Sequence, residues 1–201
     1  MPPTAFRLTP RRPWQRMSDT EWLALMPYVE RRSGPGRPLR ELRTRMDGIF
    51  HLAAATTAPW HSLPAEFGRP DTVHRYFRRL THAGLWQRLL HALAEAPEGH
   101  PLRALEAWIC RACRRAYRLL GLGFILLVRR LGLRSAMPGP PWLLPDPDLS
   151  ETLLRYPIPW PDPARRGSLT RCREVLRRLR HCLRVTAGRK SIPRSLRLAW
   201  T

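Results

Sequence analysis

The sequence predicts an all-α fold. Apolar residues recur at intervals of three and four over most of the chain, which is the period of a helix with one buried face. Residues typical of helix starts and glycine stops bound these stretches. Nine of the 22 prolines fall between residues 138 and 163, where a regular core element is not expected. The chain should therefore form a small bundle of helix-turn-helix type, an arginine-rich helical extension and a proline-rich irregular segment.

The first two helices are predicted over residues 18–30 and 39–57. Ser18 and Glu21 have the spacing of a capping box, and apolar residues follow at helical intervals. The glycines and prolines of residues 34–38 end that helix. In the second helix one face is apolar throughout, and it consists of Leu42, Met46, Ile49, Phe50 and Ala53.

The next two helices give the helix-turn-helix pattern. Residues 58–67 are predicted to be a turn with one helical turn at most. Asp71 is the expected N-cap of a helix whose stripe is Val73, Phe77 and Leu80. Gly84 is a stop signal. A further helix follows with the apolar residues Leu85, Trp86, Leu89, Leu90 and Leu93. Two helices joined by so short a turn are typical of helix-turn-helix modules.

Past residue 100 the sequence predicts one long helical stretch and one basic helix. Residues 102–133 are apolar and arginine-rich, with possible breaks at Gly121 and Gly123. The apolar run 119–128 has only ten residues, half of the roughly 20 that a membrane span needs, so a buried helix is predicted. Ser168 is the expected cap of the last helix, which carries a stripe of leucines.

These signals divide the chain into six predicted segments. They are a disordered N-terminus over 1–15, a helix-turn-helix domain over 16–97, a helical extension over 98–136, a proline-rich linker over 137–166, a basic amphipathic helix over 167–187 and a basic tail over 188–201.

The charge indicates a polyanionic partner. The chain has 36 Lys and Arg against 15 Asp and Glu, a formal net charge of +21, and a sequence pI near 11.7. Such an excess repels itself unless a partner neutralises it. Nucleic acid is the first candidate and an anionic membrane surface the second. The N-terminus lacks the apolar run of a signal peptide, so a cytoplasmic protein with reduced cysteines is expected.

The helix that begins near Asp71 holds the candidate DNA contacts. Its apolar stripe accounts for folding and leaves donor side chains on the other faces, an arrangement typical of recognition helices. A solvated amphipathic helix would share this pattern. The candidate set is Thr72, His74, Arg75, Arg78 and Arg79, together with Arg37 and Arg40 before the second helix.

Residues 16–95 resemble the N-terminal helical DNA-binding domain of bacterial insertion-sequence transposases of the DDE type. The landmarks are Glu21-Trp22, Gly36-Arg37-Pro38, Pro59-Trp60 with Leu63-Pro64, Thr72-Val73 with Phe77-Arg78-Arg79, and Gly84 with Trp86. Their order and spacing carry the resemblance. It implies a helix-turn-helix module that binds the terminal inverted repeats of the element.

The resemblance also implies a catalytic domain that the sequence does not match. In such transposases a ribonuclease-H-like domain follows, whose Asp, Asp and Glu hold two divalent metals for strand cleavage. Leu80 stands where the family often has tryptophan. The acids past residue 100 lie among prolines or in arginine-rich helices, and they are Glu106, Asp146, Asp148, Glu151, Asp162 and Glu174. No catalytic site is therefore predicted in this chain.

The remaining motifs predict neither a cofactor nor a metal. Cys110 and Cys113 form a C-x-x-C inside a predicted helix, with no second pair at matching spacing, which favours small buried side chains over a zinc site. No nucleophilic triad and no phosphate-binding glycine loop stand out, so no small-molecule substrate is expected.

Three interpretations of the basic helix at 168–185 stay open. It could be a solvated helix that packs its leucines, a second nucleic-acid surface, or a membrane-surface helix, although it lacks aromatic anchors. The whole chain likewise has three candidate roles. It could bind DNA without catalysis, it could be the DNA-binding half of a split or frameshifted transposase that acts with a separate catalytic subunit, or it could be a remnant with an interaction or membrane-surface role.

Overall fold

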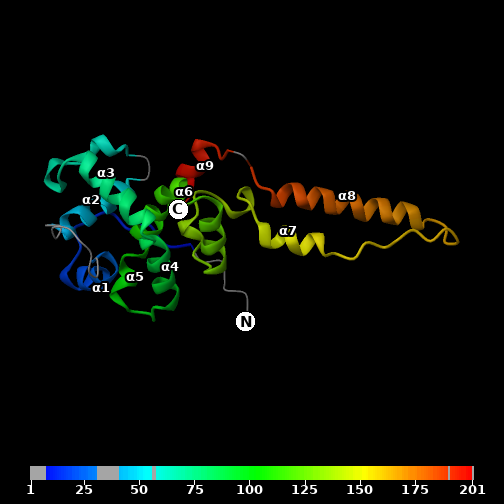
Figure 1. Ribbon diagram of the computed structural model, residues 1–201, viewed down its shortest axis with the longest axis horizontal. Coiled ribbons are helices and arrows are strands. Elements are labelled where there is room, and N and C mark those ends of the chain that lie inside the picture. The colour runs from blue at the N-terminus through cyan, green and yellow to red at the C-terminus, as the bar shows by residue number, and fades with distance from the viewer. Residues whose placement is uncertain (1–7, 31–40, 56–57, 190, 201) are drawn as a thin grey trace. The chain divides into compact units, whose positions relative to one another are not determined.

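The computed structural model describes residues 8–30, 41–55, 58–189 and 191–200. Within these ranges the chain forms helices and no strand, which confirms the predicted all-α class (Figure 1). The α-helices are α1 (Asp19–Val29), α2 (Leu42–Ala54), α3 (Pro70–His82), α4 (Leu85–Glu95), α5 (Pro101–Ala104), α6 (Glu106–Arg130), α7 (Pro147–Leu154), α8 (Ser168–Thr186) and α9 (Arg194–Ala199). Short 3-10 turns are η1 (Trp60–Ser62), η2 (Ala65–Phe67), η3 (Arg134–Ala136) and η4 (Pro141–Leu143).

The chain divides into two compact units. The first comprises residues 1–138 and 198–201, and the second comprises residues 139–197. The predicted boundary at residues 97 and 98 does not coincide with this division, because α6 packs against α2, α3 and α4. Residues 101–138 therefore belong to the same compact unit as the helices before them.

Helix α1 begins as its capping box predicts. The Ser18 hydroxyl accepts a hydrogen bond from the Glu21 amide, and the Glu21 carboxylate accepts one from the Ser18 amide. Two amides that the helix itself cannot pair are thereby satisfied. The helix buries Leu25 and Val29 against the bundle.

The core of the first unit lies between α2, α4 and α6. Helix α4 buries all five of its predicted apolar residues. Trp86 of α4, Trp108 of α6 and Phe50 of α2 have no exposed surface. Aromatic side chains bury the largest apolar areas, so these three contribute strongly to the stability of the bundle. Helix α6 leaves helical geometry at Gly121, one of the two predicted break points, where φ is 67°.

Two arginines of α6, the buried Arg111 and the half-buried Arg115, bond to carbonyls at and just beyond the C-terminal end of α2. Arg111 donates to the Ala54 carbonyl at 2.8 Å, and Arg115 donates to the carbonyls of Leu52 at 2.6 Å and Ala58 at 2.8 Å. The last carbonyls of a helix have no partner within it, and cations are favoured at that end. Burial lowers the pKa of both guanidinium groups, and repulsion from Arg11 and Arg118 respectively lowers it further.

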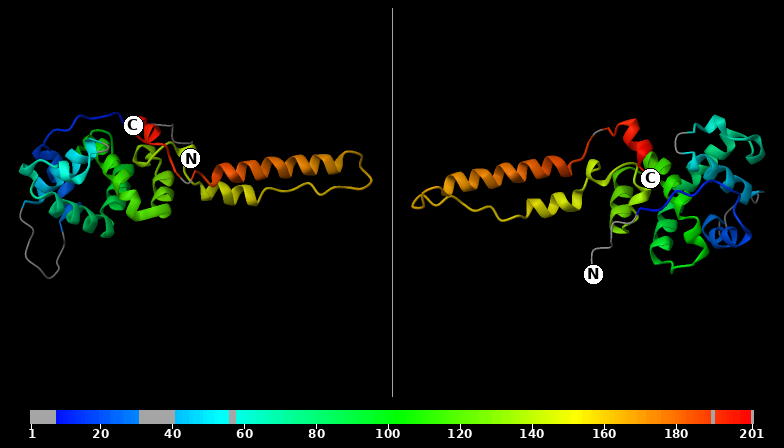
Figure 2. Two further views of the ribbon diagram at one scale, coloured as in Figure 1. Left: turned by 90° about the horizontal axis from the view of Figure 1, so that it is seen from above. Right: turned by 180° about the vertical axis from the view of Figure 1, so that it is seen from behind.

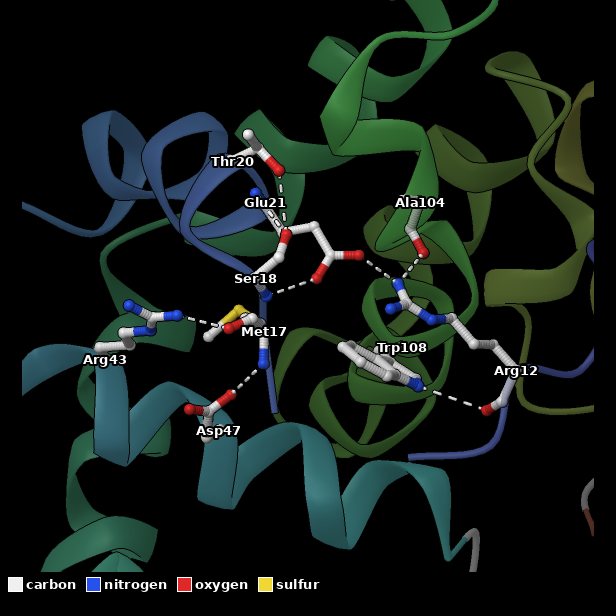
Figure 3. Close-up of polar contacts among 9 residues, drawn as sticks. All are labelled: Arg12, Met17, Ser18, Thr20, Glu21, Arg43, Asp47, Ala104 and Trp108. Carbon is white, nitrogen blue, oxygen red and sulfur yellow. Dashed lines mark hydrogen bonds and ion pairs between the residues drawn. The ribbon is translucent and has the colours of Figure 1, made fainter. Parts of the chain in front are cut away.

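The sequence predicted a disordered N-terminus over 1–15, and within that range the described residues 8–15 contact the first unit. Thr9 donates its amide to Ser135 and its hydroxyl to Glu106. The Arg12 guanidinium lies 4.1 Å from the centre of the Trp108 ring and bonds to Glu21 at 2.6 Å (Figure 3). The buried carboxylates of Glu21 and Glu106, which lie in helices, supply partners for this segment.

In the second unit, α7 lies alongside α8 (Figure 2). The Asp146 amide donates to the Thr186 carbonyl at 2.8 Å, and the hydroxyls of Ser150 and Thr186 are 2.7 Å apart. Helix α7 lies inside the stretch predicted to be a proline-rich linker. Pro147 occupies its first turn, where a proline is tolerated, and the Asp146 carboxylate caps it by accepting from the Leu149 amide.

Two further details differ from the predictions. The N-cap of α8 is Gly167, with φ at 82°, while the Ser168 hydroxyl donates to the Asp162 carbonyl. The predicted basic tail contains the short helix α9.

Among the described residues, no helix is long and apolar enough to cross a membrane.

Candidate nucleic-acid interface

Helix α3 is held in place by a continuous buried stripe. Val73, Phe77 and Leu80 are buried, as predicted, and so are Tyr76 and Thr81. The Thr81 hydroxyl donates to the Phe77 carbonyl and accepts from the Trp86 indole at 2.8 Å, which ties α3 to α4 across the turn. Gly84 starts α4 with φ at 75°, a conformation that favours glycine.

The start of α3 differs from the prediction. Arg69, not Asp71, is the N-cap, and its side chain makes no capping bond. Pro70 is the first helical residue, so Asp71 lies in the first turn. A carboxylate there is favoured by the positive end of the helix dipole, which explains why an aspartate suits the position although it is not the cap.

The outward face of α3 is basic. Arg75, Arg78 and Arg79 are exposed, and the exposed His82 extends the same face by one turn beyond Arg75 and Arg78. Among the ion pairs of the described residues, none includes any of these three arginines. Asp71 is the one acid of the helix. Three guanidinium groups thus face solvent with their hydrogen-bond donors available to a ligand.

The other two predicted contacts on α3, Thr72 and His74, lie near the N-terminal end of the helix and are half-buried. His74 stacks on Trp60 of η1, with ring centroids 4.9 Å apart and planes inclined by 23°. Thr72 is half-buried in the first turn of the helix. Arg37 and Arg40, the remaining predicted contacts, lie outside the described residues.

A tyrosine beside this face lies between two arginines. The guanidinium of Arg79 lies 5.2 Å from the Tyr76 ring centre, and that of Arg45 on α2 lies 5.8 Å from it. Burial raises the pKa of Tyr76 to about 12, against the opposing effect of both arginines. The ring attracts both cations and thereby gathers positive charge from two helices next to the outward face.

Three residues of this region were not predicted from the sequence. Arg45 and Trp60 join it through contacts between segments far apart in the chain. His82 could have been predicted, because it lies seven residues after Arg75 and therefore on the same helix face.

The described residues contain no group of three or more His, Cys, Asp and Glu side chains that could hold a metal ion. Cys110 and Cys113 are buried in α6, and burial raises the pKa of the Cys110 thiol to about 12. Glu106 pairs with Arg103, Glu151 with Arg155, and Glu174 with Arg178. These contacts give the three glutamates ion-pair partners in separate parts of the chain.

Comparison with known families agrees with the resemblance of the N-terminal half. Residues 17–90 match the family model described as "Putative transposase of IS4/5 family (DUF4096)". The match includes α1, α2, α3 and the first half of α4, and hence the whole basic face of α3. No curated protein and no solved structure matches the chain.

Proposed function

Starting from the match of residues 17–90 to a transposase family, we propose that the chain binds duplex DNA through the outward face of α3. The DNA would be the terminal repeats of an insertion element. The observation that carries the proposal is the division of α3 into a buried apolar stripe and an exposed face with three arginines outside any described ion pair.

The roles of the individual side chains follow from their positions. Arg75 lies at the centre of the outward face, where a guanidinium can bond to a guanine edge in the major groove. Arg78 and Arg79 flank it and suit phosphate contacts that set the register of the helix on the duplex. Thr72 and His74 lie towards the N-terminal end, which commonly enters the groove, and the stack on Trp60 limits the positions that His74 can reach.

The test compares two charge-matched variants of the full chain. Arg75→Ala with Arg79→Ala removes two arginines from the face. Arg16→Ala with Arg118→Ala removes two exposed arginines elsewhere in the first unit. Fluorescence anisotropy with a duplex of the element terminus should show at least tenfold weaker binding for the first variant, since each lost contact costs about 1–3 kcal/mol. Equal affinities of the two variants would rule out the α3 face.

A second candidate role is that of the DNA-binding half of a two-chain transposase. It is favoured by the absence of strands among the described residues, because a ribonuclease-H-like catalytic domain alternates strands and helices. In this role a separate catalytic subunit would cleave the DNA, and both chains would act in the cytoplasm. A second reading frame with DDE acids beside the gene would support it. Flanking DNA with neither such a frame nor inverted repeats would count against it.

A further inference from the structure

Helix α8 presents four arginines along one strip. Arg173, Arg177, Arg180 and Arg184 follow at intervals of four, three and four residues, which places them on one helix face. All four are exposed. The strip spans twelve residues, and its first and last arginines are about 16 Å apart along the axis at the rise of an α-helix. We call it the arginine strip.

The acidic side chains that form ion pairs on α7 and α8 pair with arginines outside the arginine strip. Glu174 pairs with Arg178, and Glu151 pairs with Arg155. Within the part of the chain that the structure describes, no ion pair includes a member of the strip. Residues 139–197 carry 13 basic and five acidic side chains, so the surroundings add to the positive potential of the strip.

Contacts with α7 fix the orientation of the helix. Cys172 and Thr186 are buried, and Val175, Leu179 and Leu183 on the same side of α8 are half-buried. The hydrogen bonds that Thr186 makes to Asp146 and Ser150 join the C-terminal end of α8 to the start of α7. Since the apolar side faces its own unit, the arginines project from a supported helix.

We propose that the arginine strip binds the phosphate backbone of duplex DNA as a second, sequence-independent contact, an inference that rests on the proposed function. DNA carries one negative charge per about 1.7 Å of its axis, so a strip of this length faces several phosphates. Guanidinium groups bind phosphates in a bidentate manner. The strip raises affinity for every duplex, while the α3 face selects the sequence.

A membrane surface fits the strip less well. A membrane-surface helix inserts its apolar face between lipids. In α8 that side is taken up by its own unit, and the large apolar side chains that α8 leaves exposed, Leu169, Leu176 and Val185, do not form one continuous face. Phosphate is common to lipid headgroups and DNA, so the experiment below uses both.

The experiment uses the full chain and two variants that each lose four positive charges. The strip variant is R173Q/R177Q/R180Q/R184Q, and the control is R155Q/R165Q/R166Q/R171Q, whose four arginines are exposed in the same unit off the strip. Glutamine is a good helix former, and circular dichroism checks that helicity is kept. Dissociation constants are measured for a duplex of the element terminus and for a scrambled duplex over a series of salt concentrations.

The strip variant should bind both duplexes more weakly by the same factor, so its preference for the terminus is unchanged. The slope of log Kd against log salt should fall by about 3 to 4 from loss of four phosphate contacts, and the control should change it by less than about 1. Equal slopes for the two variants would overturn the proposed binding of DNA by the arginine strip and would leave the α3 proposal intact. If R75A/R79A binds DNA like wild type while the strip variant binds DNA more weakly, the α3 proposal fails and the proposal for the arginine strip is supported.

A lipid arm separates the two sources of phosphate. Vesicles of phosphatidylcholine and phosphatidylserine are sedimented with each protein. Loss of vesicle binding in the strip variant, with DNA binding unchanged, would assign the strip to lipid and overturn the inference. Absence of DNA binding by the wild-type chain at low salt would overturn both proposals.

Discussion

His74 of α3 stacks on Trp60 of η1 with the two ring centroids 4.9 Å apart. The same indole lies 5.2 Å from the Phe77 ring and 5.5 Å from the guanidinium of Arg115. One side chain of the connection between α2 and α3 thus contacts the candidate interface, the core and α6. Trp60 thus connects the N-terminal half of α3 to a residue outside the helix.

Replacing Trp60 by alanine should weaken both folding and DNA binding. The variant loses the stack on His74, a kind of pair worth about 0.5–1.5 kcal/mol beyond the area it buries. Urea unfolding should show the lower stability, and anisotropy the weaker binding of the element terminus. Trp60→Phe keeps an aromatic ring and should lie close to wild type in both measurements. A Trp60→Ala variant with unchanged DNA affinity would show that the stack does not orient α3.

Replacing Arg115 by alanine should destabilise the first unit. Its guanidinium donates to the Leu52 carbonyl at the end of α2 and to the Ala58 carbonyl in the connection that follows, and hydrogen bonds to charged groups are worth about 1.5–3 kcal/mol each. We expect a loss of about 2–4 kcal/mol in the free energy of unfolding. Arg118→Ala, an exposed change three residues on, should stay within about 0.5 kcal/mol of wild type. Comparable losses in the two variants would contradict the capping role.

Two glycine-to-alanine changes should have opposite effects. A Cβ at Gly48 would lie 2.7 Å from the Cβ of Phe67, while one at Gly123 would meet nothing within 4 Å. Overpacking at Gly48 should cost about 1–3 kcal/mol. At Gly123, in the first turn after the break at Gly121, alanine should stabilise by up to about 1 kcal/mol, because it restricts the unfolded chain. Thermal unfolding of both variants checks the signs, and stabilisation by Gly48→Ala would show that Phe67 can move away.

Glu21 should stabilise the fold in a pH-dependent way. Burial alone would raise the pKa of Glu21, but its bonds to Arg12 and Ser18 outweigh burial and lower the pKa below 4.5. A carboxyl whose folded pKa is depressed adds stability above its unfolded pKa and loses it as the pH falls through the folded pKa. Glu21→Gln should cost about 1–2 kcal/mol at pH 7 and nothing at the acid end of the transition.

The contribution of Asp47 to stability should depend on pH in the opposite direction to that of Glu21, so Asp47 serves as the comparison. Burial raises the pKa of Asp47 above 3.8, so the folded state takes up the proton more readily than the unfolded state. Its unfavourable contribution at neutral pH is therefore relieved as the pH falls. Asp47→Asn keeps an acceptor for the Met17 amide and should unfold at higher urea concentration at pH 7. Parallel pH profiles for the two variants would contradict these assignments.

Local sequence patterns predicted most of the helices, but they did not predict the contacts between segments that are far apart in the chain. The capping box at Ser18 and the stripe of α4 are local in sequence, and both agree with the structure. Helix α7 was not predicted because its prolines suggested irregular chain, yet a proline in the first turn fits a helix. The order of residues 8–15 depends on Glu21, Glu106 and Ser135, which no local pattern connects to them.

The same distinction holds at the candidate interface. Helical periodicity placed Arg75, Arg78 and Arg79 away from the stripe, where the structure has them exposed. The pairing of His74 with Trp60, and of Arg45 with Tyr76, requires two segments to meet in space. A single sequence has no signal for such pairs.

The arginines that α6 places at the end of α2 make the N-terminal half of the bundle dependent on residues beyond the family match. A fragment ending at residue 97 would keep every helix of the matched region but lose Arg111 and Arg115, and with them the partners of the carbonyls of Leu52 and Ala54. It would also expose the faces of α2 and α4 that α6 covers. Residues 17–90 thus belong to a larger compact unit, and the candidate face of α3 is carried by a bundle that includes α6.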